Sequence, residues 1–143
     1  MCVVASGYNL VMTEKYTKFF KSLSTQNYTN FQVFHIDDNS EDETTLRLYA
    51  EVADKYPNLK GKVHFLRNKN NVGAFCNKDS GIKENCPKGS VVLDIDADDS
   101  LLSRQVMKVL NIVYQKSSPW VVYTNMIKQK SDKIFEQGKA KVL

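Results

Sequence analysis

The segment VVLDIDADDSLL, Val91 to Leu102, carries four aspartates within six residues, directly after an apolar run. The apolar run is typical of a buried strand, and the carboxylates that follow it are Asp94, Asp96, Asp98 and Asp99. Carboxylates this close repel one another, and an ion that is buried without a partner costs a great deal of free energy. We therefore expect a positively charged group at the end of this strand.

The rest of the chain alternates between strand-like and helix-like patterns. The apolar runs that predict five strands occupy residues 2–5, 31–36, 63–66, 91–95 and 119–123. A helix after Thr13 has four apolar residues on one face, namely Tyr16, Phe19, Phe20 and Leu23. Strands and helices in strict succession predict an α/β fold, with a mainly parallel sheet and helices on both of its faces.

Three further helices complete the predicted pattern. The second begins near Ser40 or Asp42 and ends at Pro57, and the third covers residues 73–84. The fourth begins at Ser100, with an inner apolar stripe formed by Leu102, Val106, Val109 and Val113. These boundaries leave short polar connections between each strand and the helix that follows it.

Polar residues follow four of the predicted strands. They are Ser6 to Asn9, Asp37 with Asp38, Arg67 with Asn68, and Asp94 to Asp99. In a parallel sheet the carboxyl ends of the strands lie on one edge, and ligands bind there at the point where the strand order reverses. We therefore expect these residues to form one site, with the aspartates gathered around a shared cation.

Oxygen ligands of this kind favour a hard divalent cation such as Mg²⁺ or Mn²⁺. Mg²⁺ usually takes only one or two protein carboxylates and completes its shell with water and substrate phosphates. A substrate that carries a diphosphate therefore suits this cluster. The structural alternative is that the aspartates lie in solvated turns or cap a helix, as Asp99 would before a helix that starts at Ser100.

Length and composition limit the class of protein. The 143 residues suit one domain with a packed core, and no apolar run approaches the roughly 20 residues of a membrane span. The net charge of +4 arises largely in a lysine-rich tail after Asn125, where we expect no regular element. Because no recognition motif accompanies these lysines, no nucleic-acid partner is expected.

Cysteine, histidine and tryptophan positions suggest structural roles. Three widely spaced cysteines are expected to be reduced thiols: Cys2, Cys76 and Cys86. Both histidines lie inside predicted strands, as packed or edge residues rather than ligands, and Trp120 is expected in the core. The N-terminus lacks the pattern of a signal peptide, which favours the cytoplasm or a cytosolic membrane face.

Four motifs, in order, resemble the family-2 glycosyltransferases. The first is SLSTQNYTNFQVFHIDDNSEDET, residues 22–44. The next two are Asn71-Val72-Gly73 and the stretch from Lys78 to Ile82, and the last is LDIDADDSLL, residues 93–102. The resemblance spans roughly residues 3–125 and implies the GT-A fold, a Rossmann-like sheet found in nucleotide-diphospho-sugar transferases.

The resemblance also implies the roles of individual residues. The implied nucleotide-sugar-binding residues are Ala5, Gly7, Asn9, Asp37, Asp38, Lys78 and Asp96. The implied ligands of Mn²⁺ or Mg²⁺ are Asp98 and Asp99. Within the first set, Asp37 or Asp38 would contact the nucleobase, Lys78 the diphosphate and Asp96 the ribose. Asp94 has no role that the family implies.

The implied activity is the transfer of a sugar from a UDP- or GDP-sugar to an unknown acceptor, with inversion, as in hexosyltransferases. Lys78 stands where the family prefers arginine, and Asp79 stands in place of asparagine. The family's acceptor-binding half, with its catalytic base, lies beyond the last predicted strand. We therefore expect a donor domain at residues 1–125, and a lysine-rich tail or the start of an acceptor half at 126–143.

Two alternatives remain open at this point. A non-catalytic or truncated binding module would keep the fold and the donor site without turnover. A receiver-type signalling domain would also place aspartates around Mg²⁺ at the strand ends. Such a domain has a lysine directly after its last strand, whereas this chain has Thr124 and Asn125 there.

Overall fold

A computed structural model describes residues 1–10, 14–41, 51–52, 54–122 and 124, and the backbone of residues 123, 126–130, 133–137 and 141–142. The chain divides into two compact units, Met1–Asn111 and Ile112–Leu143. Each unit is described separately below. None of the described helices has the length and apolar character that a bilayer crossing requires.

The first unit is built on a sheet of four strands. These are β1 (Cys2–Gly7), β2 (Gln32–Asp37), β3 (Val63–Arg67) and β4 (Val92–Asp94). Their order is β3-β2-β1-β4, and each neighbouring pair is parallel. The predicted parallel sheet is therefore confirmed, and the strand order reverses between β1 and β4.

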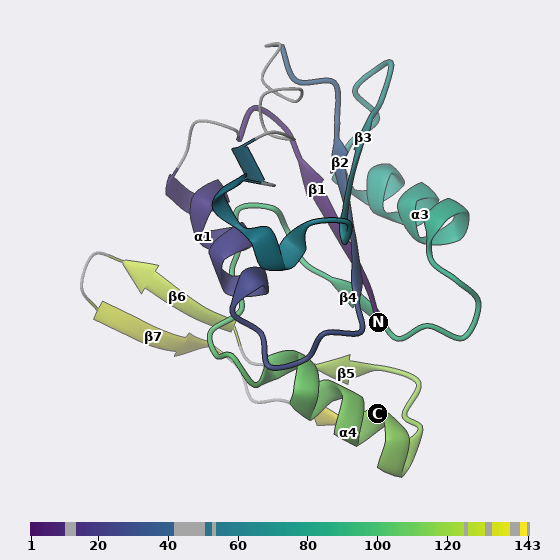
Figure 1. Cartoon of the computed structure of the whole chain (residues 1–143), viewed down its shortest axis with the longest axis vertical. Helices are drawn as coiled ribbons and strands as arrows, with labels where there is room; N and C mark the ends of the chain where they lie inside the picture. The colour runs from purple at the N-terminus through teal and green to yellow at the C-terminus, as the bar shows by residue number, and fades with distance from the viewer. Residues whose placement is uncertain are drawn as a thin grey trace. The chain divides into compact units, whose positions relative to one another are not determined.

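Helices cover both faces of this sheet, as predicted (Figure 1). On one face, helix α1 (Glu14–Ser24) buries the four residues that the sequence pattern identified: Tyr16, Phe19, Phe20 and Leu23. On the other face lies α3 (Ala74–Asn85), whose Ile82 packs against Val4 and Ile36. All six residues of β1 are buried, because this central strand has a helix-covered layer on each side.

Helix α3 approaches the sheet closely at Gly81. A Cβ atom at this position would lie 2.2 Å from Cδ1 of Ile36 and 3.2 Å from Cγ1 of Val4. Residue 81 is therefore a glycine because no side chain fits between helix and sheet.

A disulfide joins Cys2 in β1 to Cys86 at the end of α3, with 5.7 Å between their Cα atoms. The prediction of three reduced thiols is wrong for this pair, and Cys76 is a free, exposed thiol. The sequence spacing gave no sign of the pairing, because the two residues meet only when α3 packs on the sheet.

The fourth helix begins later than the sequence suggests. Helix α4 spans Val106–Ser117, and its buried residues are Met107 and Leu110 rather than the predicted stripe. Leu102 and Val109 are instead exposed, by 72% and 53%. The residues before α4 pack on the segment after α1: Gln26 donates to the carbonyl of Ser103 at 2.8 Å. The carbonyl of Ser103 is thus engaged by a side chain, whereas an earlier start of the helix would use it in a helical hydrogen bond.

The second unit differs from the expected pattern. It contains β5 (Val122–Tyr123), β6 (Met126–Lys130), β7 (Lys133–Gln137) and β8 (Lys141–Val142). The predicted fifth parallel strand is wrong, because β5 pairs antiparallel with β8. The tail contains regular structure after all, since β6 and β7 also form an antiparallel pair. Trp120 is 96% exposed, which contradicts its expected place in the core.

The predicted second helix lies largely outside the described residues, as does the Thr13 cap of the first. The described residues 51–52 and 54–55 are helical, and Val52 is buried in the core. A short 3-10 helix, η1 (Pro57–Leu59), follows, with Leu59 buried. Pro57 therefore ends the preceding segment as expected.

Candidate functional site

The carboxyl ends of the four parallel strands lie on one edge of the sheet. Gly7 is in register with Asp37, and Asp37 is in register with Arg67. The chain continues beyond β4 alongside β1, since Ala97 donates its amide hydrogen to the carbonyl of Ser6 at 3.2 Å. The structure therefore brings the predicted strand-end residues to one edge, with β1 between the two aspartate groups.

Gly7 allows three segments to meet at the end of β1. A Cβ atom here would lie 3.2 Å from Nε2 of His35, 3.3 Å from Leu10 and 3.4 Å from Cβ of Ala97. These distances are tighter than ordinary van der Waals contacts or at their lower limit, so a side chain would push the strand ends apart. Ala97 is fully buried, which fixes the backbone between Asp96 and Asp98.

Asn9 connects the loop after β1 to the loop after β2. Its backbone has a left-handed φ of 52°, which asparagine tolerates better than most residues. Its amide donates to Oγ of Ser40 at 2.9 Å, and its Oδ1 accepts from the amide of Glu41 at 3.1 Å. Tyr8, beside it, is 43% exposed, so its ring is accessible to a ligand.

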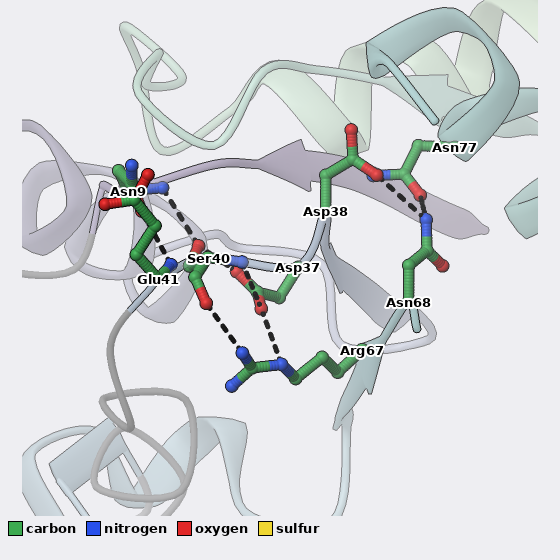
Figure 2. Close-up of polar contacts among 8 residues, drawn as sticks. All are labelled: Asn9, Asp37, Asp38, Ser40, Glu41, Arg67, Asn68 and Asn77. Atoms are coloured by element: carbon green, nitrogen blue, oxygen red, sulfur yellow. Dashed lines mark hydrogen bonds and ion pairs between the residues drawn. The ribbon is translucent and has the colours of Figure 1, made fainter. Parts of the chain in front are cut away.

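Asp37 is buried and is held by protein groups. It accepts hydrogen bonds from the amide and the hydroxyl of Ser40. The Nε atom of Arg67 lies 3.5 Å from Oδ2 of Asp37, and Nη2 of Arg67 donates to the carbonyl of Ser40 at 2.6 Å (Figure 2). These contacts fix the loop after β2 against the end of β3.

Asp38 is equally buried but points the other way, toward α3 (Figure 2). Its carboxylate accepts from the amides of Val72 and Gly73 at 3.0 and 2.8 Å, and from Asn68 at 2.9 Å. It therefore holds the loop that leads into α3. A carboxylate has about four acceptor positions, so three are already in use.

The side chain of Lys78, in α3, contacts the acidic segment after β4 and is largely shielded from solvent. Its Nζ atom lies 2.8 Å from Asp94 and 2.5 Å from Asp96, and its side chain is only 18% exposed. Burial alone would lower the pKa of Lys78, but its hydrogen bonds and charge contacts with both aspartates outweigh burial and raise it. Asp94, for which the family implies no role, is thus one of the two anions that hold Lys78.

The remaining two aspartates lie at the other end of the segment. Asp98 pairs with Lys15 of α1, with 3.0 Å between Oδ2 and Nζ. Burial, followed by the nearby charges of Asp98 and Asp96, raises the pKa of Asp99. The expected positive groups are therefore two lysines from the helices on opposite faces of the sheet. They leave part of the negative charge of four carboxylates unbalanced.

Asp98 and Asp99 provide the oxygen donors that Mg²⁺ and Mn²⁺ prefer, and the unbalanced negative charge suits a divalent cation. In the part of the chain that the structure describes, no three His, Cys, Asp or Glu side chains are grouped to hold a metal. Asp37 is held by Ser40 and Arg67, so Asp98 and Asp99 are the better candidates for metal ligands. Two carboxylates fit a cation whose remaining ligands are water and phosphate.

Three site residues had no clear signal in the sequence. Lys15 is separated from Asp98 by 83 positions, and the fully buried Asn77 donates to Ser6 at 2.9 Å. Ser40, predicted as a helix cap, is buried against Asp37 instead. Asp79, which stands in place of the family's asparagine, pairs with Lys83 on the exposed side of α3.

A shallow hollow of about 370 Å³ lies beside these residues, at the start of α3. Its lining consists of Asn68, Lys69, Asn70, Val72, Cys76 and Ser80. None of the aspartates of the β4 segment lines it. We therefore assign the candidate site to the strand ends and not to this hollow.

A parallel sheet with helices on both faces, whose acidic residues lie where the strand order reverses, is typical of Rossmann-like α/β domains that bind ligands at that edge. The model of the glycosyl transferase family 2 matches residues 13–140. The chain therefore belongs to this family, and its fold is the Rossmann-like GT-A fold. This membership replaces the receiver-type alternative.

Solved structures with the same fold include two glycosyltransferases. The chain is similar to Staphylococcus aureus TarS 1-349, with 22% identity and a TM-score of 0.66 over 82% of this chain and 32% of that one. TarS 1-349 has also been solved in complex with UDP-GlcNAc. The mannosyltransferase PcManGT from Pyrobaculum calidifontis, in complex with GDP-Man and Mn²⁺, gives 16% identity and a TM-score of 0.68 over 82% and 33%.

The chain spans about a third of the length of these two solved proteins. No curated protein sequence is similar enough to count as a match.

Proposed function

We propose that this chain is the donor-binding part of a metal-dependent, inverting glycosyltransferase of the hexosyltransferase type. Its donor is a UDP- or GDP-sugar, and the divalent metal is Mn²⁺ or Mg²⁺. The observation that carries the proposal is the Asp96-Ala97-Asp98 motif, hydrogen-bonded to the end of β1 where the strand order reverses. Nucleotide sugars in the solved relatives, UDP-GlcNAc and GDP-Man, support the same class of donor.

The loop after β1 and the Asp37–Asp38 region form the nucleoside side of the proposed site. Ala5 and Gly7 are buried and shape the end of β1, while Asn9 and Tyr8 are exposed beside it. Asp37 or Asp38 accepts from the nucleobase in addition to its protein partners. The side chain of Asp96 is 53% exposed, which leaves its carboxylate accessible to a ribose hydroxyl.

The diphosphate side lies at Asp98 and Asp99. Asp98 and Asp99 would hold the divalent cation, which would supply stabilisation of the negative charge that develops on the leaving phosphate. Lys78 contributes a fixed positive charge from α3, and its contacts with Asp94 and Asp96 keep it in place. An ammonium group is a point charge, so it supplies this charge without the bidentate geometry of the arginine that the family prefers.

Calorimetry with UDP, and separately with GDP, tests the proposal with and without Mn²⁺. We expect the wild type to bind one of them in the presence of Mn²⁺ and Asp98→Asn to bind it at least about tenfold more weakly, as expected when a charge-assisted ligand is lost. Asp79→Asn is the matched control, because it removes the same charge from a residue paired with Lys83 on the exposed side of α3. Failure of both nucleotides to bind the wild type with Mn²⁺ overturns the proposal.

A second assay separates an active transferase from a binding module. Release of the nucleoside diphosphate from a UDP- or GDP-sugar is followed with Mn²⁺ present. Turnover that is lost in Asp98→Asn supports an enzyme, whereas binding without turnover supports a non-catalytic module. We also propose a location in the cytoplasm or at a cytosolic membrane face.

A further inference from the structure

Helix α1 carries a lysine whose side chain contacts the acidic segment after β4. The Nζ atom of Lys15, in the first turn of α1, lies 3.0 Å from Oδ2 of Asp98. The side chain of Lys15 is 64% exposed and that of Asp98 is 35% exposed, so the pair is accessible to solvent and to a ligand. Lys15 was not among the residues that the family resemblance implied.

The position of α1 does not depend on this ion pair. Four aromatic and aliphatic side chains already fix the helix against the sheet: Tyr16, Phe19, Phe20 and Leu23. Ion pairs between exposed side chains add little to stability. The effect of Lys15 is therefore local, on the charge and availability of Asp98.

A second lysine on the same helix, Lys18, forms an ordinary surface ion pair. Lys18 lies 3.2 Å from Glu14, four positions earlier on α1. That pair stays within one helix turn, whereas the Lys15 pair joins two segments that are 83 positions apart. Lys18 therefore provides a matched control for Lys15, with the same charge, on the same helix and with a similarly exposed side chain.

Lys15 and a divalent cation would compete for the same carboxylate. Two positive charges in contact with one carboxylate repel each other strongly, so a cation that bound at Asp98 would displace the ammonium group. The lysine stem is long and flexible, and the displaced group stays within reach of the segment. A diphosphate that binds with the cation brings negative charge to the same place.

We propose that Lys15 holds Asp98 while the metal is absent and contacts the donor's diphosphate once the metal is bound. This inference rests on the proposed function, because it needs a metal and a nucleoside diphosphate at Asp98. It makes Lys15 a donor-binding residue whose partner changes with the state of the site. No covalent step is involved.

The test uses Lys15→Met, which keeps most of the stem and removes the charge. Two titrations are made: Mn²⁺ alone, and then UDP or GDP, whichever the wild type binds, at saturating Mn²⁺. We expect Lys15→Met to bind Mn²⁺ alone about two- to fivefold more tightly and the nucleotide about two- to fivefold more weakly, the range that an exposed ion pair supports. Lys18→Met should match the wild type in both titrations, and Lys15→Arg should restore nucleotide binding.

The outcomes separate this inference from the proposed function. Wild-type protein that binds neither nucleotide overturns the proposed function, and the inference with it. If the wild type binds a nucleotide no more tightly than Lys15→Met, the inference alone is overturned. Tighter Mn²⁺ binding by Lys15→Met without weaker nucleotide binding also overturns it, because Lys15 would then act only as a competitor for Asp98.

Discussion

Asn77 in α3 donates a hydrogen bond to Ser6 in β1, with 2.9 Å between Nδ2 and Oγ. Asn77 has no exposed surface, and its Oδ1 accepts from Asn68 at the end of β3. Asn68 in turn donates to Asp38 after β2. One buried amide thus links the carboxyl ends of three strands to the helix that carries Lys78.

Removal of this amide should destabilise the domain. We expect Asn77→Ala to lower the free energy of unfolding by about 2–3 kcal/mol, because it leaves a cavity and unpaired buried polar groups. Asn85→Ala is the control: it is the same substitution in the same helix, at a half-buried side chain that bonds only to the carbonyl of Gly81. Urea unfolding measures both, and equal losses would show that the buried link contributes nothing of its own.

The close contact between Gly81 and Ile36 predicts a coupled pair of substitutions. Gly→Ala inside a helix normally stabilises by about 1 kcal/mol, but here the new Cβ meets Cδ1 of Ile36. We expect Gly81→Ala to destabilise the wild type by about 1–3 kcal/mol, the usual cost of overpacking. In an Ile36→Val background, which lacks Cδ1, the same change should cost about 1 kcal/mol less. Strict additivity of the two changes in chemical denaturation would contradict the contact.

His35 should make the domain less stable in mild acid. Burial lowers its pKa to about 4, against a partial opposing effect of Asp37, so the folded state keeps the ring neutral below pH 6.5. Since the unfolded chain binds a proton there, the stabilising contribution is present above pH 6.5 and is lost as the pH falls toward 4. The loss between pH 7 and pH 5 is about 2 kcal/mol.

Unfolding of His35→Phe over this pH range tests the assignment. Phenylalanine suits the surrounding rings of Tyr16, Phe20 and Phe65, and it cannot take up a proton. Between pH 7 and pH 5, we expect the free energy of unfolding of His35→Phe to fall by about 2 kcal/mol less than that of the wild type. His64→Gln, at an exposed position on β3, is the control and should keep the wild-type slope. A slope in His35→Phe that equals the wild type would remove His35 as the cause.

The Cys2–Cys86 disulfide predicts a stability that depends on reductant. Its residues are separated by 84 positions, and closing a loop of this size stabilises by up to about 4–5 kcal/mol on the chain-entropy model. Thermal unfolding with and without dithiothreitol should show the loss in the wild type and in Cys76→Ser, but not in Cys86→Ala. A thiol count of three in the unreduced, unfolded protein would contradict the bond.

This disulfide also bears on the proposed location. Glutathione and thioredoxin keep most cytosolic thiols reduced, so a disulfide that persists in cells would favour an oxidising compartment over the proposed cytoplasm or cytosolic face. A thiol count on protein taken directly from its native cells under alkylating conditions decides between the two. One free thiol supports an oxidising compartment, and three support the cytosol.

The sequence predicted the first unit well where local periodicity and burial agree. The spacing of Tyr16, Phe19, Phe20 and Leu23 identified the buried face of α1, and the apolar runs identified the four parallel strands. The same reasoning failed for α4: Leu102 and Val109 belong to the predicted stripe, but both are exposed, and Leu102 lies before the helix begins. Periodicity shows that a face exists, but the contacts of Ser103 and Arg104 with the segment after α1 decide where the helix begins.

By itself, the sequence determined that acidic residues end the parallel strands, because the order of strands and helices places those ends on one edge. The partner of each carboxylate was decided only by the tertiary structure. Lys78 lies between Asp94 and Asp96, Lys15 reaches Asp98, and Arg67 holds Asp37. Charge attraction acts through space and has no sequence period, so packing of the two helices against the sheet had to set these pairs.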